Sequence, residues 1–141
     1  MIAPIANPAA IRSGYSSSSY AAAGGRILLG AIFVLSGFSK IADPASALGY
    51  IGSVGMPLPQ VALAVAILVE VVGGLALMLG YRTRLVAAAL AVFSLATASF
   101  FHSALGDQNQ FIHFFKNIAM AGGLLQVVAF GPGPIALDSR R

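Results

Sequence analysis

The sequence predicts an all-α integral membrane protein: a bundle of four transmembrane helices running up and down, with both termini in the cytoplasm. Composition, four long apolar segments and the distribution of arginine lead to this fold class. Of the 141 residues, 58% are hydrophobic and only 9% are charged, whereas a soluble domain carries about 25% charged residues. Because so few charges cannot cover a core of this size, the lipid bilayer is the expected surrounding.

The composition also excludes several kinds of site. The chain has no cysteine, so disulfides, thiolate catalysis, cysteine-bound zinc and iron–sulfur clusters are ruled out. The net charge is +4, but the basic residues are scattered and form no nucleic-acid patch. No Gly-rich nucleotide loop, Ser-His-Asp triad or carboxylate pair is present. The sequence therefore indicates no metal site and no covalently held cofactor.

The N-terminal residues 1–20 are rich in Ser, Pro and Ala without a period, which predicts a flexible tail. The first apolar segment, 21–42, imitates a cleavable signal, because a basic residue precedes its apolar run and Ala-Ser-Ala follows at 45–47. Lys40 and Asp43 fit poorly in such a cleavage region. We therefore interpret 21–42 as the first membrane span.

Three further apolar segments occupy residues 61–80, 84–105 and 111–130. Each is about 20 residues long, which is enough to cross about 30 Å of hydrocarbon as a helix. In lipid every backbone amide must find its partner within its own segment, and no strand-like alternation is visible. The four spans are thus predicted to be helices of one transmembrane domain, 21–130.

The predicted connections are short, so neighbouring helices should run antiparallel. Residues 43–60 form a Gly- and Pro-rich loop, 81–83 a tight turn after the helix-ending Gly80, and 106–110 a polar turn. Two Gly-Pro pairs end the last helix and begin a C-terminal cytoplasmic tail, 131–141.

Arginine sets the predicted orientation, because cytoplasmic loops of membrane proteins are enriched in basic residues. The loops on the opposite side carry Asp43 and Asp107. Six arginines fall on one side of the four-span arrangement: Arg12, Arg26, Arg82, Arg84, Arg140 and Arg141.

One carboxylate, Glu70, lies inside the second span. Ten residues into a helix is about 15 Å deep, near the bilayer midplane, so this side chain cannot reach the head groups. Ala66, Gly73 and Gly74 share its face, which suits a packed interface and turns Glu70 inward. An ionised carboxylate there costs at least a few kcal/mol unless it is paired or protonated.

The last span offers the first candidate partner, Lys116, which shares a face with His113 and Asn117 by helical spacing. Arg26 and Lys40 are further candidates. They share a stripe of the first span with two glycines, which favour close helix packing, although both also suit snorkelling to opposite head-group layers. One reading is a structural Glu–Lys pair that fixes helix register. The other is a polar cavity for an acidic or phenolic head group.

His102 ends the third span and His113 begins the fourth, so the turn between them should bring them to similar depth. Two such histidines could ligate a b-type haem or a metal, or they could bond to nearby loops. Nothing in the spacing favours the ligand reading.

These polar residues lie in stretches that closely resemble the DoxX family over nearly everything after residue 24. The stretches are "RILLGAIFVLSGFSKI" (26–41), "PLPQVALAVAILVEVVGGLALMLGYRTRLVA" (57–87), "FFHSALGDQNQFIHFFKNIAMAGGLL" (100–125) and "GPGPIALD" (131–138). One departure is Pro134-Ile135, where a basic and an aromatic residue are common. The resemblance implies a small four-helix protein of the bacterial inner membrane. It carries over these polar positions: Arg26, Lys40, Glu70, His102, Lys116 and Asn117.

Some DoxX relatives are membrane subunits of thiosulfate:quinone oxidoreductases, and others are linked to oxidative-stress defence in membrane-associated complexes. The resemblance therefore implies a quinone-linked redox subunit. Lys116 or His102 would bond the quinone carbonyl and Glu70 would exchange the proton, as the catalytic set. The predicted ligand-binding residues are Arg26, Lys40, His113 and Asn117. Electrons would come from a membrane or membrane-associated redox partner, since the chain encodes no redox centre.

The alternative is a non-catalytic accessory or assembly subunit. Small-residue faces would then dock larger membrane partners or further copies of the chain, and the polar core would be structural. The glycines expected to do so are Gly73, Gly74, Gly122 and Gly123.

Overall fold

The computed structural model describes residues 14–141, which are all-helical and contain no strand within that range. Its elements are α1 (Ser17–Ala42), α2 (Pro44–Ser53), α3 (Pro59–Leu68), the π-helix η2 (Val69–Gly73), α4 (Gly74–Leu79), α5 (Thr83–Phe101), α6 (Gln108–Phe130) and the 3₁₀ turn η3 (Leu137–Arg140). Four helices are long and apolar enough to cross a membrane, with α3, η2 and α4 forming one continuous span, Pro59–Leu79. The predicted all-α fold with four long apolar helices as membrane spans is confirmed.

The first and third spans differ from the prediction at their ends. α1 begins at Ser17 because the Ser16 hydroxyl accepts a hydrogen bond from the Ser19 amide, so the predicted tail is wrong for residues 17–20. Residues 1–13 of that tail, including Arg12, lie outside the described residues. The third span ends at Phe101 rather than 105, because His102 leaves the helical conformation with φ −131° and ψ 30°.

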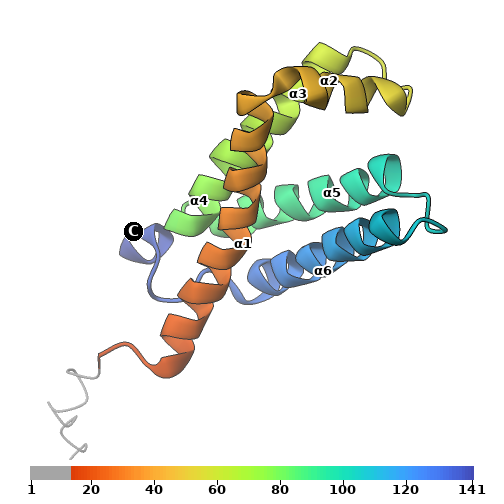
Figure 1. Ribbon diagram of the computed structural model, residues 1–141. Coiled ribbons are helices and arrows are strands. Elements are labelled where there is room, and N and C mark those ends of the chain that lie inside the picture. The colour runs from red at the N-terminus through yellow and green to blue at the C-terminus, as the bar shows by residue number, and fades with distance from the viewer. Residues whose placement is uncertain (1–13) are drawn as a thin grey trace, which may run out of the picture.

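The predicted loop 43–60 is wrong over much of its length, because Pro44–Ser53 forms the helix α2. Asp43 caps α2 by accepting the Ser46 amide at 3.1 Å, and Pro44 occupies the first turn, where a missing N–H costs nothing. This Asp-Pro start signal outweighs the glycines that follow. In Figure 1, α2 lies across the upper end of the molecule beside α3.

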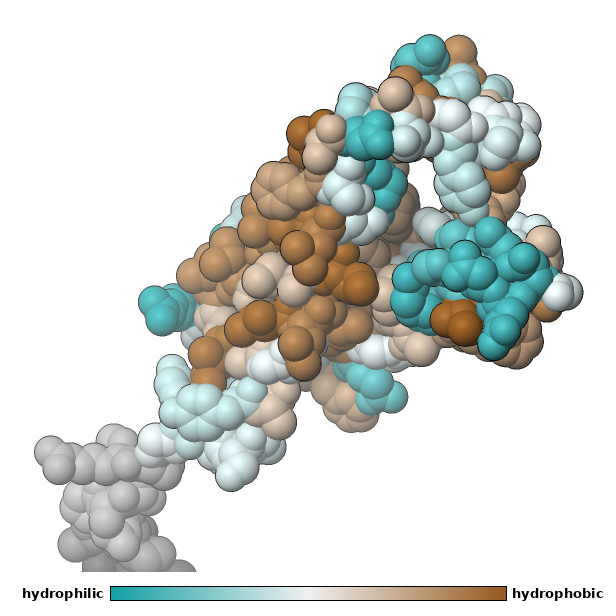
Figure 2. Space-filling view, viewed as in Figure 1, coloured by the Kyte–Doolittle hydropathy of each residue, from teal (hydrophilic) through white to brown (hydrophobic). Residues whose placement is uncertain are grey.

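The spans form two pairs. α1 packs along the span α3–η2–α4, and α5 packs along α6. The pairs meet in a core of buried side chains from both of them: Phe33, Leu77, Ala87, Leu90, Ala91, Ala121 and Leu124. They diverge toward the end that carries α2 and the α5–α6 turn (Figure 1). Large apolar side chains such as Leu28 and Phe130 are exposed, as lipid contact requires. Figure 2 shows hydrophobic surface gathered along α1.

Glycines allow the close contact between α1 and the second span. A Cβ on Gly30 would lie 2.6 Å from the Gly74 carbonyl oxygen, and one on Gly74 would lie 2.8 Å from the Gly30 oxygen. The predicted stripe of α1 is confirmed, since Arg26, Gly30, Phe33 and Gly37 are all buried, and both glycines lie against the second span.

The predicted docking faces are wrong for three of their four glycines. Gly74 contacts α1, a Cβ on Gly73 would touch Leu90 at 3.1 Å, and one on Gly123 would touch Leu29 at 3.3 Å. These positions are therefore used inside the chain. Only Gly122 of the four faces open space.

The predicted C-terminal tail is packed against the helix ends, where residues 131–141 form what we term the C-terminal clamp. Arg26 holds it: its guanidinium donates to the carbonyls of Leu77 at 2.8 Å and Ile135 at 2.7 Å, and also to that of Pro132. The Leu77 carbonyl belongs to the last turn of α4 and also accepts the Gly80 amide at 3.2 Å, so Arg26 adds a second donor at this helix end. Arg26 therefore joins α1, α4 and the clamp.

Asp138 of the clamp caps α5. Its carboxylate accepts the Arg82 amide at 2.8 Å and the Thr83 amide and hydroxyl at 2.8 and 2.7 Å. These bonds hold the pKa of Asp138 below its usual value, chiefly through the Thr83 amide. Gly80, with φ +73°, lies against Ala136 and has no room for a side chain.

Candidate ligand cavity

A cavity of about 760 Å³ lies between the two helix pairs where they diverge. α1, α2, α3, α5 and α6 all contribute to its walls, which are mostly apolar. Examples are Phe33, Val65, Phe93 and Met120. Figure 2 shows the molecule hollowed between α2 and the hydrophilic end of the α5–α6 pair. The cavity therefore belongs to the half of the bundle farthest from the C-terminal clamp.

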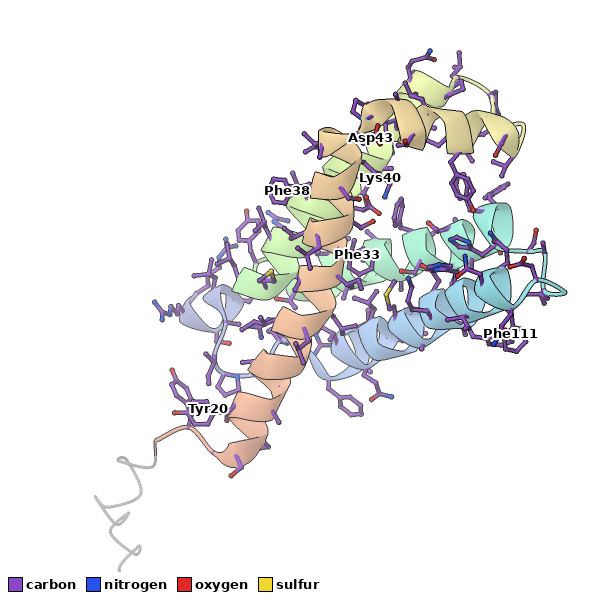
Figure 3. All side chains as sticks on the ribbon, in the orientation of Figure 1. Tyr20, Phe33, Phe38, Lys40, Asp43 and Phe111 are labelled. Carbon is purple, nitrogen blue, oxygen red and sulfur yellow. The ribbon has the colours of Figure 1, made fainter. Side chains whose placement is uncertain are left out.

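One wall carries a buried ion pair. Lys40 Nζ lies 2.9 Å from Glu70 Oε2 and 3.0 Å from Oε1. The Ser36 hydroxyl donates to Oε1 at 3.0 Å and accepts from Lys40 Nζ at 2.9 Å. Glu70 is 5% exposed and the Lys40 side chain 26%, so the pair is dry at the carboxylate and more accessible at the ammonium. Figure 3 shows Lys40 extending from α1 toward the space between the pairs.

The prediction that Lys116 is the first partner of Glu70 is wrong, while the inward direction of Glu70 is confirmed. The reason is the tight contact between α1 and η2. A Cβ on Gly37 would lie 3.3 Å from the Glu70 Cβ, so Ser36 and Lys40 of α1 reach the carboxylate first. Lys116 lies on α6, which belongs to the other helix pair.

Glu70 belongs to the π-helix η2, which the sequence did not predict. Such wider turns inside α-helices are uncommon and occur frequently at functional sites. η2 ends at Gly73, and α4 resumes at Gly74 against α1. The π-helical turn thus lies beside the cavity, and the regular α-helix α4, which follows it, packs against α1.

The opposite wall carries two histidines and a lysine. Lys116 Nζ lies 3.0 Å from His113 Nδ1, and His102 Nδ1 lies 3.0 Å from Gln110 Oε1. The His102 and His113 rings stack with centroids 5.0 Å apart, which confirms their predicted similar depth. Rings stacked on each other do not stand on the two faces of a porphyrin. Among the described residues no group of three or more His, Cys, Asp or Glu could hold a metal.

The hydrogen bonds assign complementary tautomers to the two rings. An ammonium has only donors, so His113 Nδ1 accepts and its Nε2 carries the hydrogen. An amide oxygen only accepts, so His102 Nδ1 donates and its Nε2 has a lone pair. The wall therefore offers one imidazole donor and one imidazole acceptor side by side.

The remaining predicted site residues fall into two groups. Asn117 is buried, lines the cavity and donates to the His113 carbonyl at 2.9 Å, which fixes its side chain. Arg26 does not line the cavity, because its guanidinium is held by the carbonyls of the C-terminal clamp. Arg26 thus joins the helix ends and lies apart from the cavity that Lys40, His113 and Asn117 line.

Sequence reasoning missed Ser36 and Tyr50. Ser36 stands one helical turn before Lys40, a spacing that could have associated it with the same partner. Tyr50 of α2 also lines the cavity, and its hydroxyl donates to the Phe101 carbonyl at 2.7 Å. That bond ties α2 to the end of α5 across the divergent end of the pairs. The sequence gives no local signal for this contact of Tyr50, because it depends on the segment 44–53 being the helix α2.

Comparison with known proteins identifies the family of this chain. A sequence model described as DoxX matches residues 21–103. The chain belongs to the DoxX family. It is 36% identical over 113 residues to inner membrane protein YqjF of Escherichia coli strain K12, covering 80% of this chain and 85% of that protein. It is 34% identical over 120 residues to inner membrane protein YphA of the same strain, covering 82% and 86%. No solved structure matches.

These relatives and the four apolar helices identify a multi-pass protein of the bacterial inner membrane. Within this DoxX protein the described arginines outside the spans gather at one end. The Arg82 amide bonds Asp138 of the clamp, and the Arg141 guanidinium lies 4.9 Å from the centre of the Tyr81 ring. The clamp and the α4–α5 turn therefore share one face of the membrane.

Proposed function

We propose that this DoxX protein is a quinone-linked, redox-associated membrane subunit, with the cavity as its quinone site. The Lys40–Glu70 pair carries the proposal, because it places an ionisable carboxylate on the wall of a mostly apolar cavity inside the membrane. Ionisable residues within membrane spans are rare and commonly mark proton or substrate pathways. The purely structural reading accounts for the pair but not for the cavity beside it.

The residues present fit a quinone. A cavity of about 760 Å³ falls within the roughly 300–1,000 Å³ usual for small-molecule sites. Its apolar lining suits a ring and an isoprenoid tail, and its two polar walls suit the ring oxygens. A bound quinone would accept two electrons and two protons as it is reduced to the quinol. The electrons would come from a redox protein partner, because this chain encodes no redox centre.

The side chains divide the remaining work between the walls. Lys116 and His113 Nε2 are donors for a carbonyl oxygen, and His102 Nε2 is an acceptor for a hydroxyl. Glu70 holds or accepts the proton on the other wall, with Ser36 and Lys40 orienting its Oε1. The low-dielectric lining excludes water and strengthens each of these contacts.

The orientation belongs to the same proposal. By the positive-inside rule, the clustered arginines support an orientation in which the clamp and both termini lie in the cytoplasm. The cavity then opens in the periplasmic half of the bilayer. A lipid-soluble ligand would enter between the diverging helix pairs.

The test is quinone binding to the purified protein in lipid nanodiscs. A short-chain benzoquinone is titrated into the wild type and into Glu70→Gln, and binding is followed by calorimetry. Because Glu70→Gln leaves Lys40 unpaired, the double variant Lys40→Met/Glu70→Gln is tested in parallel as a neutral wall. We expect saturable binding to the wild type and a loss of about tenfold or more in both variants, the scale of a lost charged hydrogen bond. Absence of saturable binding to folded wild type would refute the proposal.

A further inference from the structure

The charges lining the cavity do not balance. The chain has four acidic residues in total, and Glu70 is the only one that lines the cavity. It is paired with Lys40. The other three cap helices: Asp43 accepts from Ser46, Asp107 from Gln110 and Asp138 from Thr83. Within residues 14–141, Lys116 forms no ion pair.

The surroundings of Lys116 do not compensate its charge. Its ammonium donates to His113 Nδ1 at 3.0 Å, and an imidazole that accepts this bond is neutral. The side chain starts eight residues into α6, which is about 12 Å along the helix. It lines the cavity together with Phe100 and Met120. Lys116 is exposed and no carboxylate pairs with it within residues 14–141, so an anionic group that enters the cavity can reach its ammonium.

We infer that the cavity selects amphiphiles with an anionic head group, bound at Lys116, over neutral ligands of the same shape. The ligand class is an acidic enol or phenolate on an apolar tail, such as a hydroxylated naphthoquinone, or equally an alkyl carboxylate. The inference rests on the proposed function in so far as a lipid-soluble ligand occupies the cavity. Beyond that function, the inference specifies that the head group is negatively charged and that Lys116 binds it.

Of the two lysines that line the cavity, only Lys116 is available to bind an anion. Lys40 already has both oxygens of Glu70 within 3.0 Å, so an anion there would meet the carboxylate as well. On the Lys116 wall the nearest polar groups are imidazoles and the buried amide of Asn117, none of which carries negative charge. His113 Nε2, which carries its hydrogen, is a second donor available on that wall.

The test compares two ligands that differ in one group. A 2-alkyl-1,4-naphthoquinone is neutral, whereas its 3-hydroxy derivative is an acidic enol that is ionised at neutral pH. Their dissociation constants are measured for wild-type protein in nanodiscs of neutral phosphatidylcholine, which avoids competition from anionic lipids. An alkyl carboxylate and the alcohol of equal chain length form a second pair without a quinone ring.

Three variants make the result specific. Lys116→Met removes the charge at nearly constant apolar volume, and Lys116→Arg keeps the charge. Arg140→Met removes a cation from the exposed clamp, far from the cavity, as the matched control. Circular dichroism verifies that each variant remains helical.

We expect the anionic member of each pair to bind the wild type roughly tenfold to a hundredfold more tightly, as for a hydrogen bond between charged groups. The preference should vanish in Lys116→Met and persist in Lys116→Arg and Arg140→Met. Equal binding of both naphthoquinones to the wild type would overturn the inference while leaving the proposed function intact. Binding of the alkyl carboxylate that depends on Lys116, with no binding of either naphthoquinone, would refute the proposed function and leave the inference intact. A preference that survives Lys116→Met, or no binding at all, would also overturn the inference.

Discussion

Breaking the ion pair on one side only should be more damaging than removing it altogether. Lys40→Met would leave Glu70, which is 5% exposed, with the Ser36 hydroxyl at 3.0 Å as its remaining partner. Removing one member of a fully buried pair costs about 3–5 kcal/mol. The Lys40 side chain is 26% exposed, and water access screens part of this interaction. We therefore expect a loss of roughly 2–3 kcal/mol in the free energy of unfolding.

The double variant Lys40→Met/Glu70→Gln should recover about half or more of that loss, since no unpaired charge is left. Unfolding is followed by far-ultraviolet circular dichroism during titration with sodium dodecyl sulfate. Lys116→Met is the matched control, with the same substitution at the other cavity lysine. It breaks only the bond to His113 and should change stability by less than about 0.5 kcal/mol. Glu70→Gln alone is measured in the same titration. If the losses of Lys40→Met and Glu70→Gln simply add in the double variant, Lys40 and Glu70 are not coupled and the reasoning fails.

Three further predictions concern the frame around the cavity. Gly74→Ala should lower the free energy of unfolding by about 1–3 kcal/mol, because its Cβ would meet the Gly30 carbonyl, whereas Gly122→Ala should be near neutral in the same titration. Asp138→Ala should cost about 1 kcal/mol as a lost helix cap. Because the folded pKa of Asp138 is lowered, this cost is complete above the unfolded value of about 3.9 and should shrink as pH falls toward the folded value. In this cysteine-free chain, an impermeant maleimide added outside spheroplasts should label Ser103→Cys and spare Ser139→Cys; the reverse pattern would invert the proposed orientation.

The membrane spans and the glycine stripe could be predicted from the sequence, because both follow from patterns within one helix. Segment length and hydropathy locate the four spans. Helical periodicity alone places Gly30 and Gly37 on the face that packs. The inward direction of Glu70 follows in the same way, because small residues share its face.

The partner of Glu70 could not be predicted, because it depends on the register between two helices. Lys40, Lys116 and Arg26 were all plausible cations at the level of one helix. The contact of Gly37 with η2 selects Lys40. The partners of Arg26 are unpredictable for a related reason, since they lie partly in a C-terminal segment whose return to the helix ends has no local signal. The Asp43-Pro44 start of α2, by contrast, is a local signal, which the glycines of the same segment obscure.

The stripe of α1 explains why the cavity is at one end only. Arg26 joins α1 to α4 and to the C-terminal clamp, and Asp138 of the clamp caps the start of α5. The two helix pairs are thereby fixed together at this end. Fourteen residues along α1, Lys40 bonds Ser36 of its own helix and Glu70 of the second span. Nothing at that level of α1 ties it to α5 or α6 among the described hydrogen bonds, and Tyr50 of α2 makes the remaining connection to α5. On the same face of α1, Arg26 holds the two helix pairs together and Lys40 leaves them apart, which is the arrangement that the proposed entry of a ligand from the lipid requires.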